Sequence, residues 1–212
     1  MKKTLVQPLY FGPIDLFVPI AQADALAFEI NENYQKQSYR TRQYIYGANG
    51  KLLLNIPIKH NGSGAHQLLK EVKIENDFKW QRLHWKSLES AYRTSPYFEF
   101  FEDDFYPLYH KKYEYLIDFT QDAWQVLLAS LGLDLQIEFT SKYQEAQTDK
   151  EEINDLRFLG KAKRTANLNL DKYIQVFESK KGFISNLSIL DLLFNEGTNA
   201  LAYLRTQEAK EA

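Results

Sequence analysis

The stretch TLVQPLYFGPIDLFVPIAQADALAF, residues 4–28, predicts how this chain folds. Its short apolar runs at 4–6 and 25–28 are typical of β-strands, and the apolar residues along 14–21 predict a helix between them in spite of Pro19. A strand, a helix and a second strand within about 30 residues form the βαβ pattern, whose two strands pair in parallel. The opening of the chain therefore predicts an α/β protein.

Apolar patterns farther along the chain fit the same class. A nearly continuous apolar run predicts a strand at 52–58 that is buried on both faces, and shorter strands are expected at 72–74 and 135–139. Helices are expected at 78–92, 107–131, 149–159 and 186–194, with a last turn at 200–204. The predicted fold class is α/β, with a Rossmann-like, mostly parallel sheet and a helical C-terminal portion.

Length and composition bound the domain organisation and the function. The 212 residues fit one domain, with an α/β core over 1–140, a helical portion over 141–204 and a loose tail over 205–212. Because the chain has no Cys, disulfides, cysteine nucleophiles and iron–sulfur clusters are excluded. A net charge of −2 gives no electrostatic footprint for nucleic acid, and no apolar run reaches the roughly 20 residues of a membrane span. The short apolar start ends at Pro8 and does not resemble a signal peptide, so a cytoplasmic protein is expected.

The exit of the first expected strand carries candidate binding residues. Ligands of open α/β sheets bind at the carboxyl ends of the strands, so Gln7 and Tyr10 are expected to orient a ligand there. The alternative is a rigid turn in which Tyr10 packs into the core. Neither G-x-G-x-x-G nor the P-loop pattern occurs, so no glycine-rich phosphate loop is predicted.

A second candidate segment, residues 33–42, is polar and rich in Tyr and basic side chains. Arg42 is expected to hold an anionic group, because a guanidinium binds phosphate or carboxylate through paired hydrogen bonds. Tyr34 and Tyr39 lie beside these polar groups and are expected to stack on the ligand. The alternative is a solvated loop with no ligand.

His84 is the candidate acid or base. It shares one face of the helix expected at 78–92 with Trp80, which is expected to act as a stacking platform for a ligand. The alternative is a core histidine whose hydrogen bonds are satisfied within the protein. A Ser-His-Asp hydrolase has no support, because G-x-S-x-G is absent. The spacing of His60 and His66 matches no ligand pattern, so no metal site is predicted.

Aromatic residues make up 15% of the chain and gather between Tyr97 and Phe119, where acidic side chains such as Glu102 and Asp103 interrupt them. Rings beside carboxylates are used by surfaces that bind carbohydrate. The alternative is a bulky core, with the carboxylates placed favourably near a helix N-terminus. The helical spacing of these rings favours the core.

A set of motifs runs through nearly the whole chain. They are Gln7-Pro8-x-Tyr10-Phe11, Ala23-Asp24, Ser38-Tyr39 with Arg42, Leu54-x-x-Pro57, Trp80-x-x-x-His84, Tyr92-x-x-x-Pro96-Tyr97-Phe98 and the C-terminal string from Gly182 to Gly197 that contains Asn186-Leu187-Ser188-Ile189-Leu190-Asp191. Together they resemble the WbqC-like family of bacterial proteins. That resemblance implies a part in the synthesis of surface polysaccharide such as O-antigen.

The leading hypothesis is a transferase that acts on a sugar nucleotide or another activated small substrate. Gln7, Tyr10, Arg42 and His84 are expected in one pocket at the strand ends, with His84 moving a proton. Three residues of the C-terminal string are expected to line this pocket or to cap the last helix: Asn186, Ser188 and Asp191. The alternative is a non-catalytic sugar- or protein-binding component of an assembly complex that uses the aromatic segment as its contact surface. The sequence identifies no cofactor.

Overall fold

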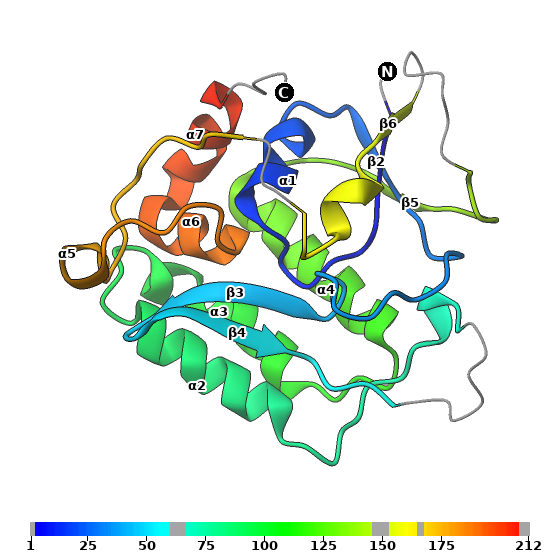
Figure 1. The fold of residues 1–212 in the computed structure, drawn as a ribbon, viewed down its shortest axis with the longest axis horizontal. Coiled ribbons are helices and arrows are strands. Elements are labelled where there is room, and N and C mark those ends of the chain that lie inside the picture. The colour runs from blue at the N-terminus through cyan, green and yellow to red at the C-terminus, as the bar shows by residue number, and fades with distance from the viewer. Residues whose placement is uncertain (1–2, 60–66, 146–152, 165–167, 208–212) are drawn as a thin grey trace.

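Four short strands form a parallel sheet in the computed structural model of the chain (Figure 1). The model describes residues 3–59, 67–145, 153–164 and 168–207. The strands are β1 (Lys3–Val6), β2 (Ala25–Phe28), β5 (Ile137–Phe139) and β6 (Ile153–Asp155), in the order β5-β2-β1-β6. The predicted α/β class and the parallel pairing of the first two strands are confirmed. Because β2 and β6 lie on opposite sides of β1, the direction of strand order reverses at β1.

The helix expected between β1 and β2 is α1 (Ile14–Ile20). Nearly all of its side chains are buried, since it packs against two C-terminal helices, α6 (Ile189–Glu196) and α7 (Ala200–Thr206). Pro19 lies in the last turn of α1, and the helix ends one residue later. The short apolar runs of the opening sequence therefore form the elements that their spacing predicts.

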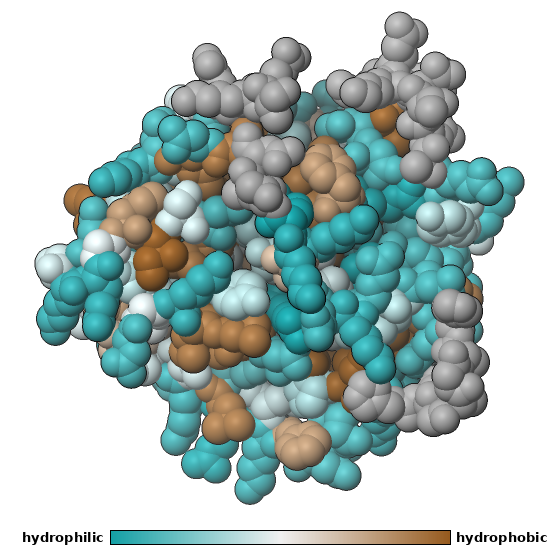
Figure 2. Space-filling model, viewed as in Figure 1, coloured by the Kyte–Doolittle hydropathy of each residue, from teal (hydrophilic) through white to brown (hydrophobic). Residues whose placement is uncertain are grey.

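A separate antiparallel hairpin joins β3 (Arg42–Gly47) to β4 (Gly50–Asn55). The strand expected at 52–58 is therefore wrong in its bounds and in its burial, since Leu52 and Leu53 are 40% and 41% exposed. The hairpin lies outside the parallel sheet, so one face of β4 is open to solvent. Figure 2 shows hydrophobic surface in this region of the molecule.

The central helices are α2 (Trp80–Tyr92), α3 (Phe98–His110) and α4 (Leu116–Leu131). The first agrees with the helix expected at 78–92, but the single helix expected at 107–131 is wrong. The chain breaks between α3 and α4 because Tyr115 pairs with Lys73 in an isolated bridge and the N–H of Leu116 donates to the Val72 carbonyl at 2.8 Å. The strand expected at 72–74 is reduced to such bridges.

The C-terminal part of the structure differs from the elements predicted from the sequence. The helix expected at 149–159 is wrong in its described part, which contains β6 and a 3-10 helix, Arg157–Gly160. The cap of α6 is Ser188 rather than Asn186. The helix α7 continues to Thr206, two residues into the expected loose tail, whose residues from 208 onward lie outside the described ones. The remaining short helices are Leu69–Glu71, α5 (Glu178–Lys181) and Gly197–Asn199. The loop with His60 and His66 lies outside the described residues.

Aromatic side chains fill the core beneath the sheet. Trp124 of α4 is fully buried, packs edge-on against Phe28 at 5.0 Å between ring centroids, and donates its indole N–H to the Leu9 carbonyl at 2.8 Å. Most rings of the segment from Tyr97 to Phe119 are also buried, although Phe100 is 70% exposed. The segment is therefore mainly core, and it does not form the continuous aromatic contact surface of the alternative hypothesis.

Candidate functional site

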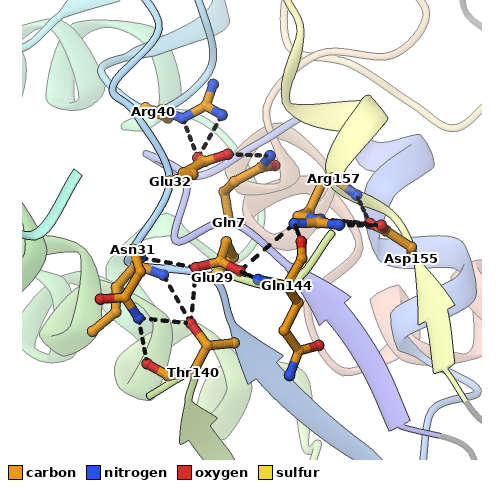
Figure 3. Close-up of polar contacts among 10 residues, drawn as sticks. Gln7, Glu29, Asn31, Glu32, Arg40, Thr140, Gln144, Asp155 and Arg157 are labelled. Carbon is orange, nitrogen blue, oxygen red and sulfur yellow. Dashed lines mark hydrogen bonds and ion pairs between the residues drawn. The ribbon is translucent and has the colours of Figure 1, made fainter. Parts of the chain in front are cut away.

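Polar side chains follow all four parallel strands at the sheet edge where the strands end (Figure 3). Gln7 follows β1, Glu29 follows β2, Thr140 follows β5, and Asp155 ends β6 with Arg157 two residues later. Because the carboxyl ends of parallel strands meet at one edge, residues distant in sequence lie together there. Figure 3 shows Thr140 turned toward Glu29 and Asp155 turned toward Arg157, and it shows Gln7 turned toward Glu32.

Glu29 lies at the centre of this group and is fully buried. One carboxylate oxygen accepts hydrogen bonds from the N–H of Asn31 at 2.8 Å and from the hydroxyl of Thr140 at 2.9 Å. The other accepts from the N–H of Gln144 at 2.9 Å and lies 3.6 Å from Nη1 of Arg157. Each oxygen thus has a partner, which is what a buried carboxylate needs to remain stable.

Arg157 is held in one orientation. Its Nε and Nη2 donate to the carboxylate of Asp155 at 2.9 and 2.6 Å, and its Nη1 donates to the Gln144 carbonyl at 2.6 Å. The ring of Tyr143 lies 5.4 Å from the guanidinium carbon. Burial alone raises the pKa of Asp155, but the hydrogen bonds from Arg157 outweigh it and hold that pKa below its usual value. Asp155 is therefore an anion at neutral pH.

A second buried ion pair lies between Arg40, which is 1% exposed, and Glu32. Nε of Arg40 donates to Glu32 Oε1 at 2.7 Å, and the side-chain amide of Gln7 donates to Glu32 Oε2 at 3.3 Å. Gln7 fits here because residue 160 is glycine: a Cβ on Gly160 would lie 2.5 Å from Gln7 Oε1. The end of β1 is thus tied to the segment that follows β2.

A cavity of about 380 Å³ opens among these groups. It is lined by Gln7, Glu32, Gln35, Tyr143, Asp155, Arg157, Phe158 and Lys161. We call it the switch-point cavity, because it lies at the carboxyl ends of β1 and β6, where the strand order reverses. This is the position at which open α/β sheets bind ligands. Tyr143 and Phe158 are about half exposed, at 52% and 50%, so their rings are accessible beside the polar lining.

The predicted binding residues divide between two cavities and the protein interior. Gln7 lines the switch-point cavity, whereas Tyr34 and Arg42 line a second cavity of about 630 Å³. We call the second one the basic cavity, because Lys36, Arg42 and Lys59 all line it. The single pocket expected to hold Gln7 together with Arg42 is therefore not what the structure contains. The physical reason is that segment 34–37 lies between the two cavities and lines both.

Tyr10, His84 and Trp80 lie together, but in the interior. The Tyr10 hydroxyl lies 2.9 Å from Nδ1 of His84, and the imidazole ring also lies near the backbone of Asn55. Trp80 packs edge-on against His84, with 5.2 Å between ring centroids. Burial lowers the pKa of His84 to about 4 and raises that of Tyr10 well above its ordinary value. This environment favours the core-histidine alternative, and a catalytic role for His84 stays a prediction.

Tyr39 links two of these regions through its backbone. Its N–H donates to the Gly160 carbonyl at 3.0 Å, and its carbonyl accepts from the N–H of Tyr10 at 2.9 Å. Its side chain is only 8% exposed, and burial raises the pKa of the hydroxyl to about 12. Tyr39 is thus largely enclosed, and its expected stacking on a ligand stays a prediction.

The three C-terminal candidates make structural contacts. Asn186 accepts the N–H of Asp15 in the first turn of α1 at 3.0 Å, and Ser188 caps α6 by accepting the N–H of Leu190. Asp191 is fully buried and accepts hydrogen bonds from a group of three side chains: Tyr92, Tyr173 and Gln175. The bond of Ser188 fits the capping alternative, whereas Asn186 binds the first turn of α1 and does not cap α6. The three bonds to Asp191 make it a buried link between segments.

Sequence reasoning missed most of the residues at the sheet edge, namely Glu29, Glu32, Asp155, Arg157 and Lys161. A signal for Glu29 was present, because it directly follows a strand that was predicted correctly, and Glu32 lies in the segment after that strand. Among the described residues no group of three or more His, Asp or Glu is arranged to hold a metal ion, and no helix there is long and apolar enough to cross a membrane.

Comparison with known proteins agrees with the resemblance seen in the sequence motifs. The model of the WbqC-like protein family matches residues 7–169, a range that contains both cavities and excludes Asn186, Ser188 and Asp191. The chain is also similar to the uncharacterized protein Rv1507c of Mycobacterium tuberculosis, at 25% identity over 97% of this chain and 98% of that protein. No solved structure gives a significant match.

Proposed function

The chain belongs to the WbqC-like protein family, and from that premise we propose that it binds an activated, sugar-bearing substrate in the switch-point cavity and acts as a transferase in surface-glycan synthesis. The observation that carries this proposal is the combination of polar groups and accessible rings at the point where the sheet order reverses. Proteins that bind sugars use carboxylates and amides for the hydroxyl groups and aromatic rings for the C–H faces.

The lining of the switch-point cavity supplies each of these groups. Glu32 and Asp155 contribute carboxylates, and an ionised carboxylate has about four acceptor positions. Three of those of Glu32 are used by Arg40 and Gln7, which leaves one for a hydroxyl group, whereas Arg157 uses those of Asp155, which contributes mainly its negative charge. The rings of Tyr143 and Phe158 offer stacking surfaces. The ammonium group of Lys161 lines the same cavity and suits the phosphate of an activated sugar.

The transfer step rests on the family resemblance, and a second candidate function has its own support. His84, the predicted acid or base, lies in the interior, whereas Gln7 lines the switch-point cavity. That separation favours the alternative of a non-catalytic sugar-binding component. The two functions differ in turnover: a transferase converts a bound sugar nucleotide in the presence of an acceptor, whereas a binding component releases it unchanged.

The experiment is a thermal-shift screen of the full chain against sugar nucleotides, followed by calorimetric titration of the ligands that stabilise it. A ligand at 100 times its Kd stabilises the native state by about 2.7 kcal/mol. We expect Phe158→Ala and Tyr143→Ala each to weaken binding about fivefold, since a stacked aromatic contact contributes on the order of 1 kcal/mol.

Ile174→Ala is the matched control, because Ile174 is 80% exposed and lines neither cavity. It should bind the ligand like the unmodified chain. The proposal fails if no sugar nucleotide raises the melting temperature, or if all three variants bind equally well.

A further inference from the structure

The basic cavity lies across segment 34–37 from the switch-point cavity. Tyr34, Lys36 and Gln37 line the basic cavity, and Gln35 lines the switch-point cavity. Neighbouring side chains of this segment therefore face different cavities. The basic cavity is the larger of the two, at about 630 against 380 Å³, so it has room for a ligand of its own.

Its lining carries an excess of positive charge. Three cations, Lys36, Arg42 and Lys59, line it together with one acidic side chain, Glu75, which gives a formal charge of 3 − 1 = +2. The whole chain has a net charge of −2, so this concentration of cations is local. Among the described residues none of the three cations forms an ion pair within 4.0 Å.

Arg42 is oriented by neighbours that leave its outer nitrogens available. Its Nε donates to the side-chain oxygen of Asn55 at 3.3 Å, and the Thr41 hydroxyl donates to the same oxygen at 3.4 Å. The hydroxyl of Tyr34 lies 3.4 Å from that of Thr41. Nη1 and Nη2 of Arg42 form no hydrogen bond with the described residues, and these are the donors that a guanidinium uses for paired contacts to an oxyanion.

Buried groups hold the wall of this cavity from behind. The imidazole of His84 lies near the backbone of Asn55, and its Nδ1 is 2.9 Å from the hydroxyl of the fully buried Tyr10. Asn55 and Arg42 are opposite each other in the β3–β4 hairpin, so the strand pairing fixes the backbone of both residues.

We propose that the basic cavity is a second ligand site that binds a phosphate-bearing small molecule, with pyrophosphate-type anions preferred over single phosphates. Three cations in one cavity favour a ligand with several negative charges, because each oxyanion then meets a separate donor. The exposed ring of Phe78, at 64%, lines the same cavity and offers a surface for the organic part of the ligand. Binding of the anion does not depend on the proposed function. If the protein is a transferase, this ligand would be its second substrate, and that part of the inference rests on the proposed function.

The test is a calorimetric titration of the full chain with inorganic pyrophosphate and, separately, with inorganic phosphate. We expect saturable binding, tighter for pyrophosphate, that weakens as the salt concentration rises. Arg42→Gln and Lys36→Gln should each weaken pyrophosphate binding about tenfold, since a charge-assisted contact contributes on the order of 1.4 kcal/mol, the equivalent of that factor. Lys86→Gln is the control, because Lys86 is exposed on α2 and does not line the cavity.

The outcomes separate this inference from the proposed function. Pyrophosphate binding that depends on Arg42 but not on Phe158 supports the inference even where no sugar nucleotide binds. Absence of pyrophosphate binding, or equal losses in Arg42→Gln, Lys36→Gln and Lys86→Gln, overturns it. Loss of pyrophosphate binding in Phe158→Ala overturns it too, because the anion then occupies the switch-point cavity.

Discussion

The buried ion pair between Arg40 and Glu32 gives the sharpest test of how the candidate site is built. The side chains are 1% and 8% exposed, and the carboxylate has one further partner, the amide of Gln7 at 3.3 Å. Arg40→Met removes the guanidinium while keeping a long side chain of similar length. The carboxylate of Glu32 is then left in the interior with one long hydrogen bond.

The expected cost follows from that geometry. Removal of one partner of a buried pair leaves an uncompensated charge and costs about 3–5 kcal/mol. Glu32→Gln should cost a similar amount, because Arg40 is even more deeply buried. The double variant Arg40→Met with Glu32→Gln contains neither charge, and replacement of both members of such a pair is often close to neutral. We therefore expect the free energy of unfolding of the double variant to exceed that of either single variant by about 2 kcal/mol or more.

The assay is urea unfolding followed by the fluorescence of the three Trp residues. The slope of the free energy with urea should stay the same, since the exposed surface of the unfolded chain is unchanged. At roughly 2–4 °C per kcal/mol, each single variant should also melt roughly 6–20 °C lower. The reasoning is refuted if Arg40→Met costs less than about 1 kcal/mol, or if the double variant loses the sum of both single losses.

Two further predictions concern the interior and the helix ends. Because the pKa of His84 is about 4 in the folded chain and about 6.5 when unfolded, the unfolded state binds the proton first, and stability should fall by about 3 kcal/mol between pH 6.5 and 4. His84→Gln should lack this part of the pH dependence. The prediction is contradicted if the free energy of unfolding, measured with urea at each pH, falls equally with pH in the variant and in the unmodified chain. Gly182→Ala should cost about 1 kcal/mol for its positive φ of 77° in open space. Gly197→Ala should cost roughly 2–4 kcal/mol, because its Cβ would also lie 2.4 Å from the Tyr97 ring. If the Gly197→Ala and Gly182→Ala variants melt at the same temperature, that clash is excluded.

The part of the fold that could be predicted is the part with local signals. β1, α1 and β2 follow one another closely, and their apolar spacing differs clearly between strand and helix. β6 has no such signal, because Ile153-Asn154-Asp155 is short and mostly polar and becomes a strand only by pairing with β1, far away in sequence. The break between α3 and α4 has the same origin, since the backbone pairing of Tyr115 with Lys73 decides it.

The candidate site was predictable to a similar extent. The general rule for strand ends led to Gln7 and to the segment that contains Arg42, and both line cavities. Asp155 and Arg157 were missed because the strand that positions them was missed. His84 and Tyr10 do lie next to each other, as predicted, but both are buried. Helical periodicity alone does not distinguish a helix face turned to a cavity from one turned to the core.

Arg40 links the walls of the two cavities and so fixes their positions relative to each other. It binds Glu32, which lines the switch-point cavity, and it directly precedes Thr41 and Arg42, which line the basic cavity. A buried, hydrogen-bonded side chain thus anchors both walls, so neither can move without breaking the pair. Transfer between two bound substrates requires that their reacting atoms be held within about 3–3.5 Å of each other. Because segment 34–37 lies between the two cavities, a fixed wall keeps ligands bound in them apart, and a two-substrate transferase would need reacting groups that reach past this segment.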